Sequence, residues 1–469
     1  MNYSRNEQSP PTQPISKVTH SETMRILNIV TITQILIFFE GSTPYALKRG
    51  FDVAFCCTPD DENTGNVVRE KMNAGFFAVY IARNMTPFQD IYSLIKLYKI
   101  IRKYKPTIVN ASTPKAALLG TIASWLAGTP IRVYHHRGLR LETTSGLKRK
   151  ILWLSDYLTC LLSIRVICDS KSLQNTIVKE GLVKYDKTRV LCSGSCNGVS
   201  LQRYSLTSET IAKSREIKEK HFLNEGPVLG YVGRIVCDKG ILELRQVFET
   251  IRKTFPKAKL ILIGNEEKGD PVDSETNVWL NNAENIIKTG RVKYPEYYYG
   301  LMDVLVFPSY REGFGNVIIE ASAMGVPTVG FNTTGVVDAI DDGETGMIVP
   351  MKDSDAMTEA VLRYLNNPEL RWKHALAGRK RVVRNFQPPM IWEAYHQEYC
   401  NLLKQKNIPI PVPEVEPKPS VLVDQEEDIK EFVKWYAVKE IVLKNKDISS
   451  VSQNLGVDEK EIRKLLEQG

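Results

Sequence analysis

Two carboxylates eight positions apart mark the segment with the clearest chemical potential, "DVLVFPSYREGFGNVIIEASAMGVPTVG", which runs from Asp303 to Gly330. Glu312 follows a short apolar run and begins a glycine-rich loop, and Glu320 lies inside a helix that we expect from about Val317. Because an apolar run ends just before Glu320, a purely solvent-facing role is unnatural for this residue. We expect Glu312 at the carboxyl edge of a parallel sheet, where such folds bind ligands.

The loop that follows Glu312 is suited to an anion. Gly313 and Gly315 allow the backbone to approach a ligand without a Cβ in the way. Asn316 is expected to be the N-cap of the helix, so that the free N–H groups of its first turn and the positive end of its dipole point toward the loop. This geometry favours an anionic ligand beside Glu312.

Two cations follow another predicted strand, in "VLGYVGRIVCDKG". Arg234 and Lys239 lie five residues apart and can clamp a diphosphate through charge-assisted hydrogen bonds. A basic loop by itself is usually only solvated. The functional interpretation therefore rests on the expected position of both residues at the same sheet edge as Glu312.

The motifs "GRIVCDKG", "LILIG", "TGRV", "VFPSYREGFGNVIIEASAMGVP" and "DGETGMIV", in this order, resemble the donor-site motifs of the family 4 retaining glycosyltransferases, such as those of bacterial capsule and exopolysaccharide synthesis. The resemblance covers about residues 24–405 and implies the GT-B fold, two Rossmann-like domains that face each other across a cleft. It implies that Arg234 and Lys239 bind the donor diphosphate. It also implies that Glu312 contacts the transferred sugar, that Glu320 holds the ribose, and that Arg291 and Val292 lie against the base. Further donor-side residues are Gly233, Gly264, Gly313, Phe314, Gly315 and Asn316.

No cofactor is expected. A retaining transfer without an obvious nucleophile fits front-face attack, in which Arg234 and Lys239 stabilise the leaving diphosphate and replace a divalent metal ion. The lone Asp-x-Asp pair, Asp353 and Asp355, begins a predicted helix and is interpreted as a helix cap.

The first half also resembles the family, through "STPKAALLG" and "NGVSLQRY", but it departs from the pattern twice. The usual glycine-rich loop after the first strand is replaced by "TQILIFFEGSTPYALKRG", which leaves Gly41 as a candidate for acceptor contacts. In "YHHRGLRLETTSG", Arg137 stands where the family often has histidine, directly after His135 and His136. We list His136 and Arg137 as candidate catalytic residues and His135 as an acceptor-side residue. Which of the three faces the reacting sugar is open, and a strand-end histidine is more often packed or at the surface.

Apolar runs that alternate with helical segments predict an α/β class with two doubly wound parallel sheets. The first sheet is expected from the strands Arg25–Thr31, Asp52–Cys57, Phe76–Tyr80, Thr107–Asn110, Ile131–His135, Val166–Cys168 and Val190–Leu191. The second is expected from Val228–Val232, Leu260–Ile263, Ile286–Thr289, Val304–Phe307 and Thr328–Gly330. The expected divisions are a disordered leader over 1–22, an acceptor-binding domain over 23–204 with a crossover helix at about 390–406, a donor-binding domain over 226–389, a proline-rich linker over 407–423 and a helical tail over 424–469.

The tail contains "DISSVSQNLGVDEKEIRKLLEQ", which superficially suggests a helix-turn-helix. From Asp424 onward, 11 acidic residues stand against 8 basic ones, the wrong sign for a phosphate-binding surface. We expect no nucleic-acid partner and interpret the tail as an appendage that can dock a protein partner.

The net charge of +8 conceals an asymmetry, because residues 1–225 carry 31 Lys and Arg against 18 Asp and Glu. Much of this excess lies between Ile91 and Lys150, which predicts either contact with an anionic membrane surface or a solvated helix face. No apolar run is long enough to span a bilayer, and the first residues lack the apolar stretch of a secretory signal. The eight scattered cysteines lack zinc-site spacing and fit reduced thiols.

The resemblance, taken together with these observations, implies a cytoplasmic glycosyltransferase at the inner face of the membrane. It would move a hexose or N-acetylhexosamine from a UDP-sugar to a polyprenyl-diphosphate-linked saccharide in surface polysaccharide synthesis. The alternatives are a UDP-sugar 2-epimerase of similar architecture, which would need acid and base residues around the sugar ring, and a non-enzymatic sensor of nucleotide-sugars.

Overall fold

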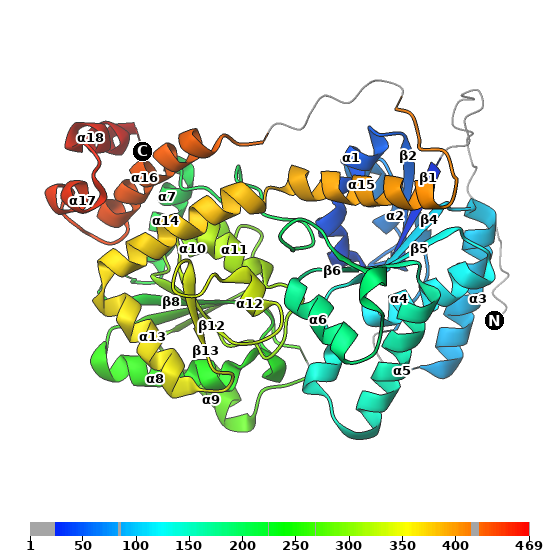
Figure 1. The fold of residues 1–469 in the computed structure, drawn as a ribbon. Helices are drawn as coiled ribbons and strands as arrows, with labels where there is room; N and C mark the ends of the chain where they lie inside the picture. The colour runs from blue at the N-terminus through cyan, green and yellow to red at the C-terminus, as the bar shows by residue number, and fades with distance from the viewer. Residues whose placement is uncertain (1–23, 83–85, 224, 268, 414–421, 469) are drawn as a thin grey trace, which may run out of the picture.

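The computed structural model describes residues 24–82, 86–223, 225–267, 269–413 and 422–468. They form two α/β domains side by side (Figure 1). The leader expected over residues 1–22 lies outside the described residues, as do residues 414–421 of the expected linker.

Within the described residues, the N-terminal domain has a seven-stranded parallel sheet in the order β3-β2-β1-β4-β5-β6-β7. The order reverses between β1 and β4, as it does in doubly wound folds. The strands are β1 (Met24–Ile32), β2 (Phe51–Thr58), β3 (Gly75–Ala78), β4 (Ile108–Ser112), β5 (Ile131–His136), β6 (Arg165–Cys168) and β7 (Thr188–Val190). The helices are η1 (Thr33–Phe39), α1 (Ser42–Leu47), α2 (Thr64–Met72), α3 (Pro87–Tyr104), α4 (Pro114–Leu126), η2 (Arg140–Thr143), α5 (Gly146–Leu162), α6 (Lys171–Lys179) and η3 (Tyr185–Lys187).

The C-terminal domain repeats the plan with six parallel strands in its described part, in the order β10-β9-β8-β11-β12-β13. The strands are β8 (Val228–Val232), β9 (Lys259–Ile263), β10 (Ile286–Gly290), β11 (Val304–Phe307), β12 (Thr328–Phe331) and β13 (Gly346–Val349). The helices are α7 (Ser208–Lys220), η4 (Cys237–Lys239), α8 (Ile241–Thr254), α9 (Ser274–Asn282), α10 (Glu296–Tyr299), α11 (Asn316–Ala323), α12 (Val336–Ala339), α13 (Ser354–Asn366) and α14 (Pro368–Asn385).

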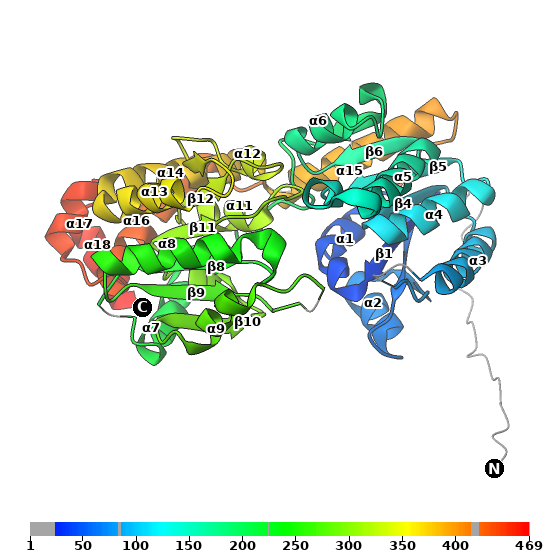
Figure 2. The same cartoon turned by 90° about the horizontal axis from the view of Figure 1, so that it is seen from below.

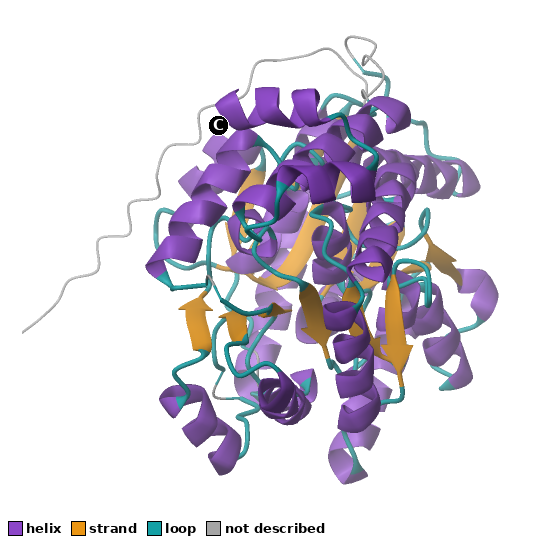
Figure 3. Cartoon of the chain, turned by 90° about the vertical axis from the view of Figure 1, so that its left-hand side faces the viewer, coloured by secondary structure: helices purple, strands orange, loops and turns teal. Residues whose placement is uncertain are grey.

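Both faces of each sheet are buried, and this explains why the strands read as continuous apolar runs. In β1, Leu27 and Ile29 belong to one apolar cluster, whereas Ile26 and Val30 belong to the cluster on the opposite face. This alternation follows from the two-residue repeat of a strand. Figure 3 shows helices on both sides of the strands. The predicted α/β class with two doubly wound sheets is confirmed.

Two local predictions were wrong. Strand β13 was not predicted, because Gly346–Val349 is short, begins with glycine and becomes a strand only by pairing with β12. Asn316 was expected to be the N-cap, but the cap is Gly315, whose φ of 90° lies in the left-handed region, and Asn316 is the first residue of α11. Its side chain is therefore free for contacts outside the helix.

The chain runs from the N-terminal to the C-terminal domain, back to the N-terminal domain, and then to the C-terminal domain again. It enters the C-terminal domain after β7 and returns beyond Phe386 as helix α15 (Pro388–Gln405), which lies along the N-terminal domain (Figure 1). The α15 residues Tyr399, Leu402 and Leu403 belong to the same apolar cluster as Ile26 and Val53. The last helix of the body therefore completes the core that β1 began.

The tail is helical, with α16 (Gln425–Val442), α17 (Ile448–Leu455) and α18 (Glu459–Gln468). The sequence did not indicate that α16 packs into the C-terminal domain itself. Phe432 and Tyr436 are buried there, and both rings contact the indole of Trp372 on α14. The buried ion pair between Arg379 and Asp428, with 2.5 Å between nitrogen and oxygen, fixes the start of α16 to α14.

Candidate functional site

The predicted carboxylate and lysine meet at the carboxyl edge of the second sheet. The ammonium of Lys239, in η4 after β8, lies 2.6 Å from Glu312 Oε1, after β11. Lys239 also donates to the Ser309 hydroxyl at 3.2 Å and to the Arg311 carbonyl at 3.1 Å. The lysine is buried, so this pair is a fixed feature of the loop rather than a surface contact. Sequence reasoning missed Ser309, although it stands three residues before Glu312.

Arg234 lies at the same edge but is more accessible. Its side chain is 47% exposed and donates to Glu267 Oε2 at 3.0 Å. Asp238 stands between the two cations in sequence and bonds Arg311 Nη2 at 2.5 Å. The edge therefore carries two positive charges, an exposed one on Arg234 and a buried one on Lys239.

Glycines allow the strand ends to pack closely here. A Cβ on Gly264 would lie 1.8 Å from the Gly233 carbonyl oxygen, so no larger residue fits between β8 and β9 at this point. Next to Gly264, Asn265 accepts a hydrogen bond from the backbone N–H of Arg291 at 3.0 Å. The side chain of Arg291 is exposed and Val292 is half-buried, which leaves both available at the end of β10.

The Glu312 loop is held by the other domain. A Cβ on Gly313 would lie 2.6 Å from the Arg137 carbonyl oxygen, so the loops after β5 and β11 are in contact. Asn316 accepts from the Ser195 hydroxyl at 2.9 Å and donates to Cys196 Sγ at 3.2 Å. Phe314 is buried and packs against Phe386, at 5.4 Å between ring centroids.

Further contacts show that the carboxyl edges of the two sheets face each other. Asp338, on α12, accepts from the backbone N–H of Lys171 at 3.0 Å and of Ser172 at 3.2 Å, at the start of α6. Arg311 donates to the Thr143 hydroxyl at 3.0 Å. Figure 2 shows this arrangement from a second direction.

Glu320 lies one helix turn beyond Asn316 and is held by aromatic hydroxyls. Its Oε2 accepts from Tyr299 at 3.1 Å. Burial raises the pKa of Glu320 to about 7, against hydrogen bonds from Tyr299 and Tyr204 that lower it. A carboxyl group with this pKa can hold or release a proton near neutral pH.

The two histidines of β5 lie on opposite faces of the strand. His135 faces α15, with its Nε2 2.6 Å from Asp169 Oδ1 and 2.9 Å from the Tyr395 hydroxyl. His136 packs against Tyr134, and neither ring nitrogen has a hydrogen-bond partner among the described residues. Burial lowers the pKa of His136 to about 4, so this ring is neutral at physiological pH.

Arg137 and Gly41 complete the candidate acceptor side. The backbone of Arg137 touches the Glu312 loop, as described above, and its guanidinium lies over the rings of Phe38 and Phe39. A Cβ on Gly41 would lie 2.1 Å from the Trp392 ring, so the glycine is needed for packing against α15. The structure thus brings Arg137 to the contact between the domains and leaves Gly41 beneath the helix.

Two family models match the chain, Glycosyltransferase Family 4 over residues 44–202 and Glycosyl transferases group 1 over residues 213–381. The capsular polysaccharide biosynthesis glycosyltransferase CapM of Staphylococcus aureus is 36% identical over 381 residues, which are 81% of this chain and 98% of CapM. The chain belongs to the family 4 glycosyltransferases. Another relative of this glycosyltransferase is the UDP-Gal:alpha-D-GlcNAc-diphosphoundecaprenol alpha-1,3-galactosyltransferase of Escherichia coli, which is 26% identical over 68% of this chain and 81% of the relative.

Solved structures share the fold of this glycosyltransferase. HepE of Anabaena in complex with UDP matches with a TM-score of 0.65 at 16% identity, over 81% of this chain and all of HepE. Sucrose-phosphate synthase of Thermosynechococcus elongatus matches with a TM-score of 0.67 at 20% identity, over 81% of this chain and 100% of the synthase. The predicted GT-B fold is confirmed.

The described residues of the glycosyltransferase contain neither a membrane-spanning helix nor a cluster of metal ligands. None of its described helices combines the length and apolar character needed to cross a bilayer. The described His, Cys, Asp and Glu side chains form no group of three or more that could hold a metal ion. Asp353 caps α13 by accepting from the backbone N–H of Ala356 at 2.8 Å, as expected for a helix cap.

Proposed function

We propose that the protein is a retaining, metal-independent glycosyltransferase that moves a hexose or N-acetylhexosamine from a UDP-sugar to a lipid-linked saccharide in surface polysaccharide synthesis. The observation that carries this proposal is the Lys239–Glu312 pair, with Arg234 beside it, at the carboxyl edge of a doubly wound sheet. The printed functions of the capsular relative from Staphylococcus aureus and of the galactosyltransferase from Escherichia coli support the choice of substrates.

In this mechanism, Arg234 and Lys239 neutralise the donor diphosphate as the bond from the anomeric carbon to the phosphate oxygen breaks. The phosphate oxygen takes the proton of the acceptor hydroxyl, whose oxygen forms the new bond on the same face of the sugar. Lys239 is held by Glu312 before the donor arrives, so its charge is already in position. Glu312 then accepts hydrogen bonds from sugar hydroxyls, and Glu320 accepts from those of the ribose.

We further propose that the protein binds an anionic membrane from the cytoplasmic side, through one face of α3. Phe88, Ile91, Tyr92 and Ile95 are exposed there, with Phe88 91% exposed, and their spacing places them on one side of the helix. Exposed basic residues, among them Lys96, Lys99 and Lys103, flank them. In Figures 1 and 2, α3 lies at the end of the N-terminal domain away from the C-terminal domain.

The test measures release of nucleoside diphosphate from UDP- and GDP-sugars in EDTA, with and without a lipid-diphosphate-linked sugar. Wild type is compared with Glu312→Ala and Arg234→Ala, and with Lys257→Ala, an exposed surface pair with Glu225, as the matched control. We expect acceptor-dependent release that survives chelation, is retained by the control and is lost in the two site variants. Epimerised sugar without release, or binding without turnover, would overturn the proposal.

A further inference from the structure

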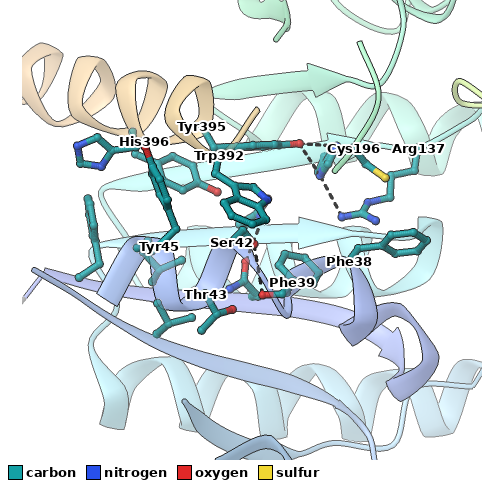
Figure 4. Close-up of a pocket in the computed structure, with 18 residues that line it drawn as sticks. Phe38, Phe39, Ser42, Thr43, Tyr45, Arg137, Cys196, Trp392, Tyr395 and His396 are labelled. Atoms are coloured by element: carbon teal, nitrogen blue, oxygen red, sulfur yellow. Dashed lines mark hydrogen bonds between the residues drawn. The ribbon is translucent and has the colours of Figure 1, made fainter. Parts of the chain in front are cut away.

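A small cavity of about 60 Å³ lies in the N-terminal domain beneath α15 (Figure 4). Aromatic side chains form much of its wall, namely Phe38 and Phe39 of η1, Tyr45 of α1, and Trp392 and Tyr399 of α15. None of the lining residues is an Asp or Glu. The cavity is therefore an amphipathic space without a negative charge of its own.

Arg137 is the single Lys or Arg among the residues that line this cavity. Its Nη2 lies 3.3 Å from His135 Nδ1, but its buried Nε and Nη1 have no hydrogen-bond partner among the described residues. Burial and the charge of Arg137 lower the pKa of His135, against the opposing effect of Asp169. Unpaired guanidinium N–H groups beside apolar rings call for an anionic hydrogen-bond acceptor.

The position of the cavity relates it to the donor loop. The Arg137 backbone touches Gly313, next to Glu312, and Cys196 lines the cavity while its sulfur accepts from Asn316. One water needs about 10 to 15 Å³ of such space, so the cavity has room for a few waters or for a small polar group. The acceptor sugar would lie on the Glu312 side, where the Arg137 backbone touches Gly313, with a small anionic group in the cavity.

We propose that Arg137 binds a phosphate group of the lipid diphosphate that carries the acceptor sugar, and that the aromatic wall contacts the first apolar carbons of the lipid. This inference rests on the lipid-linked acceptor of the proposed function. In this inference, Arg137 makes the enzyme prefer lipid-linked sugars over free sugars as acceptors. Arg137 stands where histidine is more usual.

The test is binding of geranyl diphosphate to the full-length protein by calorimetry, with saturating UDP present so that the donor diphosphate site is filled. Geraniol tests the apolar wall alone, and methyl glucuronide tests a sugar carboxylate as the other source of an anion. The variants are Arg137→Gln and Arg137→Lys, with the exposed Arg140→Gln as the matched control. Affinity for UDP and the melting temperature verify that each variant is folded.

We expect wild type and Arg140→Gln to bind geranyl diphosphate equally, and Arg137→Gln to bind it roughly tenfold to a hundredfold more weakly, as for the loss of one charge-assisted contact. Arg137→Lys should be intermediate, and it serves alone if the Gln variant does not fold. Equal affinity in all variants, or Arg137-dependent binding of methyl glucuronide only, would overturn the inference. If the protein releases UDP in the presence of the acceptor but gives one of these two binding results, the proposed function stands and only the role of Arg137 is wrong.

Discussion

At the scale of single residues, Lys239 and Glu312 form a pair that is complete before any substrate arrives. The partners of Lys239 at this edge are Glu312, Ser309 and the Arg311 carbonyl, so a donor phosphate must take over some of these contacts. Because Lys239 would bind the diphosphate and Glu312 the sugar, substitutions of the two should affect different ligands.

We expect Lys239→Met to lower the affinity for UDP by roughly tenfold to a hundredfold, because a charge-assisted contact to the diphosphate is lost. Glu312→Gln should leave UDP affinity within about threefold and abolish most sugar transfer, because UDP has no sugar for this carboxylate to bind. Calorimetry with UDP and a transfer assay separate the two. If both variants lose affinity for UDP to the same extent, the division of roles between Lys239 and Glu312 is wrong.

The raised pKa of Glu320 predicts a pH-dependent stability. The folded chain holds this proton more tightly than an unfolded chain with the ordinary value of 4.5, since burial raises the pKa to about 7. The contribution of this proton to the free energy of unfolding is therefore fully present below pH 4.5 and is lost as the pH rises through 7. The melting temperature of Glu320→Gln relative to that of wild type, measured without UDP, should therefore rise as the pH is raised from 5 to 8. A difference that stays constant across this range would contradict the pKa.

Chemical type and spacing were sufficient to predict that Lys239 lies near Glu312, because parallel strands bring their carboxyl ends to one edge, but they did not indicate Ser309. Orientation was not predictable in β5. Three consecutive candidates, His135, His136 and Arg137, cannot all face one site, and the strand turns His136 away from α15. The contact between Gly41 and Trp392 joins positions about 350 residues apart, and no local pattern encodes it.

At the scale of elements, α16 shows the same limit. Its apolar residues were visible in the sequence, but their partners, Trp372 on α14 and Gly325 just after α11, were not. Tyr436 lies 4.6 Å from Trp372 between ring centroids, and a Cβ on Gly325 would lie 2.9 Å from the Tyr436 ring. The helix is also tied by Lys444, whose ammonium lies 2.8 Å from the buried Asp303 carboxylate.

We expect Tyr436→Ala to lower the free energy of unfolding by about 3 kcal/mol, the usual cost of truncating a buried aromatic side chain. Phe88→Ala, which truncates a ring that is 91% exposed, should change it by less than about 0.5 kcal/mol. Urea denaturation followed by tryptophan fluorescence measures both. Equal stability of the two variants would mean that α16 is a dispensable attachment.

At the scale of the whole molecule, the exposed apolar face of α3 and the basic charge beside it predict binding to anionic vesicles. Replacing Phe88 and Ile91 by serine should reduce binding to phosphatidylglycerol vesicles at least roughly tenfold, because two side chains lose their burial in the lipid. Val278→Ser, an exposed apolar change on α9 of the other domain, is the control. Cosedimentation gives the affinities. If the α3 substitutions leave vesicle binding unchanged, α3 is a solvated helix face and not a membrane contact.

The path of the chain through both domains has a consequence for the order in which they are made. Helix α15 belongs to the N-terminal core, yet it begins 198 residues after β7 ends at Val190. At about 5 to 20 residues per second, the ribosome needs on the order of 10 to 40 s to synthesise that stretch. During this interval Phe51 lacks its contacts with His396 and Tyr399, and the aromatic wall of the Arg137 cavity lacks the side chains that α15 supplies. The first domain to be translated therefore stays unfinished until residue 405 has emerged, and the newborn chain needs protection from aggregation until then.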